Sequence, residues 1–287
     1  MSEKNPDGPD GRRAARERLV RGRELDKARE KRRRLLIVCA AVVCVLGLAA
    51  VIGVIAANAG RKDSQSTKET TAPPTGPVAA PSGATGGNQP AITVGKADAP
   101  STLTVWEDFR CPVCAQFETT MRDAIHELVD SGQLKADYHF ATIIDGNLGG
   151  TGSVRAANAA ACAQDAGKFV EYHDLLFENQ PSEAQDAFGD NAELIQLSAQ
   201  VEGLDTPAFR GCVEKGTYDA WVNRSAEAFH TAGHRGTPTV LLNGEPIFPA
   251  KGGEPLTPDS LRTWVAEANK GRQPGTASAP PSTPGTS

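Results

Sequence analysis

Cys111 and Cys114 are the residues whose types and spacing most directly indicate chemistry. They enclose two other residues in the tetrad Cys-Pro-Val-Cys, and cysteines at this spacing can alternate between a dithiol and a disulfide. Because exchange proceeds by thiolate attack, one thiol must ionise below the usual pKa of about 8.5. The tetrad therefore predicts thiol–disulfide exchange, with Cys111 as the nucleophile and Cys114 as the resolving thiol.

A strand and a helix are predicted to position the tetrad. Residues 103–106 form a short apolar run. Apolar side chains then recur at helical spacing, at Phe117, Met121, Ile125 and Leu128. We therefore expect Cys111 at a helix N-terminus, exposed to incoming chains, with Cys114 shielded one turn further on. The helix dipole and the amides of Val113 and Cys114 would lower the pKa of Cys111 to about 5.5. Pro112 suits the first helical turn and, with Val113, completes the catalytic motif.

An uncharged stretch of 23 residues, 35–57, is long enough to cross the hydrocarbon layer of a membrane. The leader before it, 1–34, contains 13 Lys or Arg, whereas two basic residues follow the stretch closely. This asymmetry predicts a single-pass signal anchor in the cell membrane, with the N-terminus in the cytoplasm and the rest of the chain outside. A cleaved signal peptide is the alternative, because Ala57-Asn58-Ala59 resembles a cleavage site, but the apolar run exceeds the usual length of about 7–15 residues.

Two segments rich in Pro, Gly, Ser and Thr flank one predicted folded domain. Residues 58–90 are expected to form a disordered linker, and residues 271–287 a disordered tail. The domain between them, 91–270, holds 13 basic and 26 acidic residues, which gives a formal charge of −13. This acidic character, without a basic stripe, argues against nucleic acid as the ligand.

Strand and helix patterns alternate within 91–270. Residues 134–140 alternate strictly between apolar and polar side chains and predict a second strand. Residues 153–232 are predicted to be a helical insert. Residues 237–242 and 245–248 flank an Asn243-Gly244 turn and predict a hairpin. Three helix starts carry capping or first-turn signals, at Asp190, Thr206 and Thr257. The predicted order is strand, helix, strand, helical insert, strand, strand, helix.

This order, with Cys-Pro-Val-Cys after the first strand and Gly236-Thr237-Pro238-Thr239 before the hairpin, resembles the DsbA-like branch of the thioredoxin superfamily. The membrane-tethered forms of high-GC Gram-positive bacteria look most similar around Trp-Glu-Asp-Phe. The resemblance implies an α/β thioredoxin-like fold with an inserted all-helical subdomain, preceded by one transmembrane helix. It also implies that Thr237 and Pro238 form a cis-proline loop that pairs with extended substrate. An ordinary trans proline beginning an edge strand is the alternative.

The function implied by the resemblance is an extracytoplasmic thiol:disulfide oxidoreductase that introduces disulfides into reduced exported proteins and needs no cofactor. A membrane oxidase of DsbB or VKOR type would restore its disulfide. Two positions depart from the family pattern. Val105 stands where many relatives keep a buried carboxylate, with Glu107 and Asp108 at other offsets. Val113 stands where the strongest oxidants carry His, which predicts a less extreme oxidant.

Cys162 and Cys212 remain once the tetrad and the two cysteines of the apolar stretch are set aside. An even pair in a compartment where thiols oxidise predicts a structural disulfide between them. Two separate buried thiols are the alternative, since free cysteine behaves as a small hydrophobic residue.

Three other functions fit parts of the pattern. A zinc site could combine the tetrad with Cys162 and Cys212, but structural zinc normally takes a second closely spaced pair, so no metal is predicted. A redox-inactive binding module would keep the tetrad as a structural staple and seal Cys111 from solvent. A disulfide isomerase or reductase would use the same fold and cysteines to rearrange or break bonds.

Overall fold

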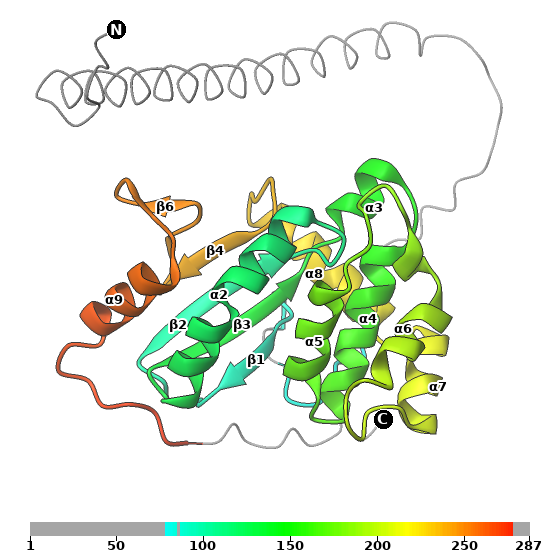
Figure 1. Ribbon diagram of the computed structural model, residues 1–287, viewed down its shortest axis with the longest axis horizontal. Helices are drawn as coiled ribbons and strands as arrows, with labels where there is room; N and C mark the ends of the chain where they lie inside the picture. The colour runs from blue at the N-terminus through cyan, green and yellow to red at the C-terminus, as the bar shows by residue number, and fades with distance from the viewer. Residues whose placement is uncertain (1–77, 85–86, 278–287) are drawn as a thin grey trace, which may run out of the picture. The chain divides into compact units, whose positions relative to one another are not determined.

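The structure, a computed structural model, describes residues 78–84 and 87–277, with a five-stranded sheet at the centre of the domain. The strand order is β1-β3-β2-β4-β5. The strands are β1 Ile92–Gly95, β2 Ser101–Glu107, β3 Leu134–Phe140, β4 Thr239–Leu242 and β5 Glu245–Pro246. β2 and β3 are parallel, whereas β1 pairs antiparallel with β3 and β4 with β2. Figure 1 shows α2 across one face of this sheet and most of the helical insert at its side.

β2 contacts a different layer on each face, because successive side chains of a strand point to opposite sides. Val105 belongs to the main hydrophobic core, together with the apolar side of α2 (Pro112–Asp130). Trp106 packs instead with Phe229 of α8 (Asp219–Thr231) in a second, smaller cluster. The sheet is therefore covered by α2 on one face and by α8 on the other.

α2 begins directly after Cys111, at the predicted junction between a strand and a helix. The Cys111 backbone is extended, with φ −79° and ψ 118°, and Pro112 occupies the first helical turn as predicted. The predicted apolar side of the helix is buried, and it includes Cys114, Phe117, Met121, Ile125 and Leu128. The apolar period thus orients the helix so that Cys114 faces the core.

The helical insert connects β3 to β4. It consists of α3 Ile143–Leu148, α4 Gly152–Asp165, α5 Phe169–Glu178, a 3-10 turn at Ala187–Gly189, α6 Asn191–Ser198, α7 Pro207–Lys215 and α8. The side chains of Asp190 and Thr206 accept hydrogen bonds from the amides of Ala192 and Phe209, which confirms two of the predicted helix starts. The helices of the insert begin at Ile143 rather than at the predicted residue 153. The sequence did not indicate α3, because this helix is too short to show an apolar period.

The strands differ from the prediction at both edges of the sheet. β1 has only four residues, too few for a recognisable pattern, yet it pairs with β3 along its whole length. The predicted return strand 245–248 shortens to β5, since Pro246 and Pro249 have no amide hydrogens to donate. A second hairpin follows, formed by β6 Ala250–Lys251 and β7 Glu254–Pro255. The last helix, α9 Pro258–Ala268, starts at the predicted Thr257 cap.

The described part of the chain extends beyond 91–270 at both ends. The amide of Ser82 donates to Asp165 at the end of α4. The Asp98 carboxylate accepts hydrogen bonds from the amides of Thr276 and Ala277, in the predicted tail. The predicted leader 1–34 and apolar stretch 35–57 lie outside the described residues. Among the helices that are described, none has the length and apolar character needed to span a membrane.

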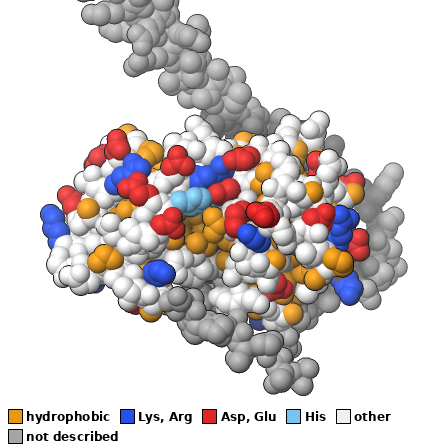
Figure 2. All heavy atoms as spheres, turned by 60° about the horizontal axis from the view of Figure 1, so that its bottom comes forward, with side chains coloured by type: hydrophobic (Ala, Val, Ile, Leu, Met, Phe, Trp, Pro, Cys, Tyr) orange, Lys and Arg blue, Asp and Glu red, His pale blue; other side chains and the backbone are white. Residues whose placement is uncertain are grey.

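One face of the molecule is shown in Figure 2. Acidic and basic side chains lie next to one another on it, and hydrophobic side chains form small patches between them. Across the described residues of this face, the basic side chains form no continuous stripe. This surface has the mixed, acidic character expected from the charge of residues 91–270.

Candidate active site

The sulfur of Cys111 lies at the N-terminus of α2, and both cysteines of the tetrad are in the dithiol form. The Cys111 Sγ lies 3.4 Å from the carbonyl oxygen of Thr237. A hydrogen bond from the Cys114 thiol, and then the side chain of Thr237, lower the pKa of Cys111 to about 6, although burial opposes this shift. The amides of Cys114 and Val113 also donate to the sulfur. Cys111 is therefore largely a thiolate near neutral pH, as its position predicts.

Cys114 has the opposite environment. It is fully buried, and burial together with the neighbouring Cys111 raises its pKa well above the ordinary value. It therefore stays protonated where Cys111 is ionised. One anionic and one neutral sulfur in contact are what a nucleophile and its resolving partner require.

Cys111 is less accessible than the sequence suggests. We expected it to be exposed, but only 6% of its surface is accessible. The reason is the loop before β4, whose Thr237 carbonyl and hydroxyl lie against the sulfur. The neighbouring Val113 is 45% exposed and Pro112 is also exposed, so the surface beside the sulfur is apolar and open.

The peptide bond between Thr237 and Pro238 is cis, so the trans alternative does not hold. Pro238 is buried, and the loop leads directly into β4, which pairs with β2. This arrangement brings Thr237 next to Cys111 across 126 residues of sequence. That Thr237 and Pro238 bind substrate stays a prediction.

Arg110 holds the active-site loop against the insert. Its buried guanidinium contacts Asp145 Oδ1 at 2.6 Å and Asp186 Oδ1 at 3.1 Å. The neighbouring Asp108 accepts hydrogen bonds from the amides of Arg110 and Ile144, and burial raises the pKa of Asp108 to about 6. The charge of Arg110 is thus used to pair with carboxylates of the insert.

Gln180 makes a second connection between the insert and the active-site loop. Its Nε2 donates to the carbonyl oxygens of Phe109 and Cys111, each at 2.9 Å. Sequence reasoning missed this residue, because Gln180 lies 69 residues from Cys111 and no local pattern marks it. The amide fixes the backbone on both sides of Arg110.

A buried acidic cluster lies on the α2 side of the sheet. Glu107 is on the same face of β2 as Val105, and Glu118 is on the buried side of α2, one turn after Cys114. His173 of α5 lies 2.9 Å from Glu107 through Nε2. Burial, and then the charge of Glu107, raise the pKa of Glu118 well above the ordinary value. Sequence reasoning noted Glu107 but did not group it with Glu118 and His173, which come from other elements.

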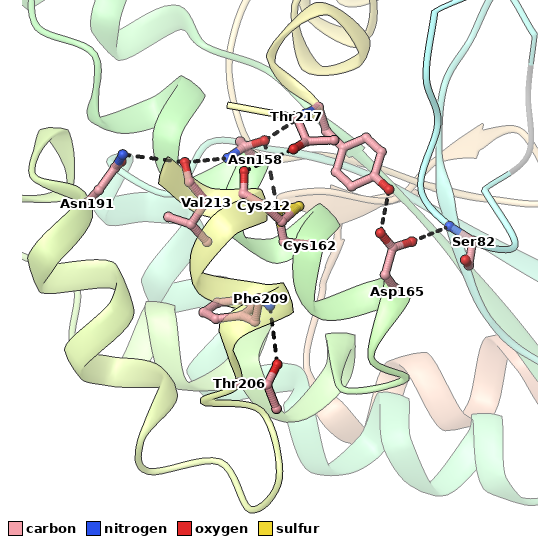
Figure 3. The surroundings of a disulfide bond; sticks show 11 residues. Ser82, Asn158, Cys162, Asp165, Asn191, Thr206, Phe209, Cys212, Val213 and Thr217 are labelled. Atoms are coloured by element: carbon pink, nitrogen blue, oxygen red, sulfur yellow. Dashed lines mark hydrogen bonds between the residues drawn. A yellow bond between two sulfur atoms is a disulfide. The ribbon is translucent and has the colours of Figure 1, made fainter. Parts of the chain in front are cut away.

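Cys162 and Cys212 form the predicted disulfide, with the sulfurs 2.04 Å and the Cα atoms 5.9 Å apart. Figure 3 shows that the bond connects α4 to α7. Asn158 on α4 supports the same junction, since its side chain donates to the Val213 carbonyl and accepts from the Tyr218 amide. Neither sulfur of this pair is available as a zinc ligand. A zinc site that combines the tetrad with Cys162 and Cys212 therefore does not exist in this structure.

The site as a whole has one ionised and one protonated cysteine between a strand and a helix, beside a cis-proline loop. This arrangement defines a thiol:disulfide oxidoreductase of the thioredoxin-like class.

Known proteins resemble this chain in sequence and in fold. The thioredoxin family model matches residues 87–267. Disulfide bond formation protein D of Bacillus subtilis is 30% identical over 174 residues, which are 55% of this chain and 72% of that protein. Oxidised DsbA from Mycobacterium tuberculosis is 29% identical, with a TM-score of 0.53 over 62% of this chain and 92% of that one. BdbD from Bacillus subtilis, at 24% identity and a TM-score of 0.53, covers 66% of this chain and 97% of its own, and shares the fold.

The chain belongs to the thioredoxin family, in its DsbA-like branch, and is a thiol:disulfide oxidoreductase.

Proposed function

We propose that the protein is an oxidase that donates its Cys111–Cys114 disulfide to reduced proteins outside the cytoplasm. The observation that carries this proposal is the pKa of Cys111, lowered to about 6 beside a protonated Cys114. A stabilised thiolate favours the dithiol over the disulfide, so the disulfide accepts electrons readily. Val113 in place of His makes it a milder oxidant than the strongest relatives.

The exchange proceeds in two attacks. A substrate thiolate attacks Cys111 Sγ of the disulfide, and a mixed disulfide forms as the bond to Cys114 breaks. The Cys114 sulfur leaves with the electron pair and takes up a proton, which its raised pKa favours. A second substrate thiolate then attacks the substrate sulfur of the mixed disulfide and releases the Cys111 thiolate. The substrate is oxidised by two electrons and the tetrad is reduced by two.

Substrate is proposed to lie along the loop at Thr237 and Pro238. The Thr237 backbone is next to Cys111 Sγ, so an extended chain paired with this loop would place its sulfur at the nucleophile. The exposed side chain of Val113 offers apolar contact beside it. Such backbone pairing accepts many sequences, as a general oxidase requires.

The proposed location is the outer side of the cell membrane. Residues 35–57 would anchor the chain there, with the basic leader in the cytoplasm. A membrane oxidase of DsbB or VKOR type would then reoxidise the tetrad. Fractionation tests the anchor: the full chain should stay with membranes after carbonate washing, and a chain lacking residues 35–57 should not. A full chain released by the wash would contradict the anchor.

The oxidase proposal is tested by mixing the oxidised full-length protein with a reduced, unfolded substrate and counting substrate disulfides. We expect substrate oxidation that Cys111→Ser abolishes, and a reduction potential between about −180 and −120 mV. A potential near about −270 mV would identify a reductase instead. Rearrangement of a scrambled substrate without net oxidation would identify an isomerase.

A further inference from the structure

Glu107, Glu118 and His173 converge from three different elements, β2, α2 and α5. One ligand-type atom of each lies within 4.8 Å of the other two. All three residues are at most 1% exposed. The fold therefore buries two carboxyl groups and an imidazole at one point, which has a large desolvation cost unless something compensates it.

Two oxygens of this cluster accept no hydrogen bond from an N–H or hydroxyl donor of the described residues. They are Glu107 Oε2 and Glu118 Oε1, and both are buried. Buried polar atoms without partners are rare in folded proteins, and a bound ion is one explanation for them. Carboxylate oxygen and imidazole nitrogen are ligands that zinc and similar divalent cations accept.

His173 is oriented as a metal ligand would be. Its Nδ1 lies 3.2 Å from Asp174 Oδ1, while its Nε2 lies 2.9 Å from Glu107 Oε1. A ligating histidine commonly donates its other ring N–H to a carboxylate, which fixes the ring and strengthens the ligating nitrogen. Atoms bound to one tetrahedral zinc at about 2.0–2.1 Å lie roughly 3.3 Å apart, so small side-chain rotations would close the site.

The surroundings of the cluster favour a bound cation over water. The rings of Phe109, Tyr138, Phe169 and Phe177 surround His173 at centroid distances between 4.8 and 5.7 Å. The cationic side chain of Arg122 contacts Asp174 at 3.4 Å, and Asp174 in turn contacts His173 Nδ1. A divalent cation would balance two carboxylates within this apolar shell.

We infer that Glu107, Glu118 and His173 form a binding site for one divalent transition-metal cation, with Zn²⁺ as the best match and Asp174 as the residue that orients His173. The site connects the strand before the tetrad, the helix after it and the insert. It does not depend on the direction in which the cysteines exchange electrons.

Zinc binding to the full-length protein tests this inference. The protein is purified without a polyhistidine tag, stripped of metal and kept with Cys111 and Cys114 oxidised, so that the thiols of the tetrad cannot bind zinc. We expect about one Zn²⁺ per chain. Glu118→Gln, which preserves size, should weaken binding at least about 10-fold, and Asp174→Asn by about 10–100-fold. Glu227→Gln, exposed on α8, is the matched control and should bind as the native protein does.

Co²⁺ in place of Zn²⁺ gives a second readout that a structural role would not produce. The native protein should develop visible d–d absorption, and Glu118→Gln should not. Absence of zinc binding and of these bands in the native protein overturns the site, whether or not the variants fold. Unchanged binding by a folded Glu118→Gln variant also overturns it, because the ion would then lie elsewhere.

Discussion

The two sulfurs of the tetrad differ because their surroundings differ. Cys111 precedes the first turn of α2 and receives hydrogen bonds from a thiol and from amides, whereas Cys114 faces the core. Amide donors at a helix N-terminus stabilise an anion, and burial destabilises one. A displacement of one helical turn therefore separates a nucleophile from a protonated partner.

This difference predicts how stability depends on pH. The pKa of Cys111 is about 6 in the folded dithiol, below its reference value of 9.0. Ionisation of Cys111 therefore stabilises the folded protein fully above pH 9, and this stabilisation is lost as the pH falls through 6. Folded Cys114 stays protonated across this window, and unfolded Cys114, with a reference pKa of 9.0, ionises only at its upper end. The free energy of unfolding of the reduced protein should rise relative to the oxidised protein between pH 6 and 9, by at most about 1.4 kcal/mol per pH unit.

Denaturant unfolding of both redox forms at several pH values measures this difference. Cys111→Ser is the control, because it removes the ionising group and should remove the slope. A gap between the two forms that is independent of pH would contradict the assignment of the thiolate.

At the scale of the elements, the insert supports the active-site loop as well as enlarging the domain. Arg110 and Gln180 connect the loop 109–111 to segments of the insert. Buried carbonyl groups need hydrogen-bond donors, and the side-chain amide of Gln180 donates to two of these carbonyl groups. The loop geometry thus depends on contacts made by residues far along the chain.

Replacing Gln180 with Leu should destabilise the protein by about 1–3 kcal/mol, because the carbonyls of Phe109 and Cys111 lose their donor. Chemical denaturation measures the change. Gln196→Leu, on the exposed side of α6, is the matched control and should stay within about 0.5 kcal/mol of the native protein. Equal effects of the two substitutions would show that the contact contributes nothing.

The disulfide between α4 and α7 should stabilise the insert. It closes a sequence separation of 50 residues, for which the chain-entropy model gives about 4 kcal/mol. The double variant Cys162→Ala, Cys212→Ala should lose about that much unfolding free energy while its tetrad still cycles. A loss below about 1 kcal/mol would mean that the helices pack equally well without the bond.

For the whole molecule, local patterns predict the order of elements well. The apolar period of α2, the alternation of β3 and the caps at Thr206 and Thr257 all depend on neighbours in sequence, and the structure contains them. Contacts between distant segments leave no such pattern. Gln180 and the partners of Glu107 escaped prediction for that reason, as did β1, which is defined by its pairing with β3.

The low exposure of Cys111 also arises at this scale, because the loop that covers it follows the whole insert. The sequence predicts a helix N-terminus that is exposed to solvent on one side. In the structure, the chain returns at Thr237 and covers that side. The return of the chain to Cys111 also places the Thr237 side chain among the groups that lower the pKa of Cys111.

The most direct test of the account is the thiolate absorbance of the reduced full-length protein as a function of pH. One thiolate should appear with a midpoint near pH 6, and Cys111→Ser should abolish this step. A first ionisation at the ordinary thiol value of about 8.5 would contradict the account.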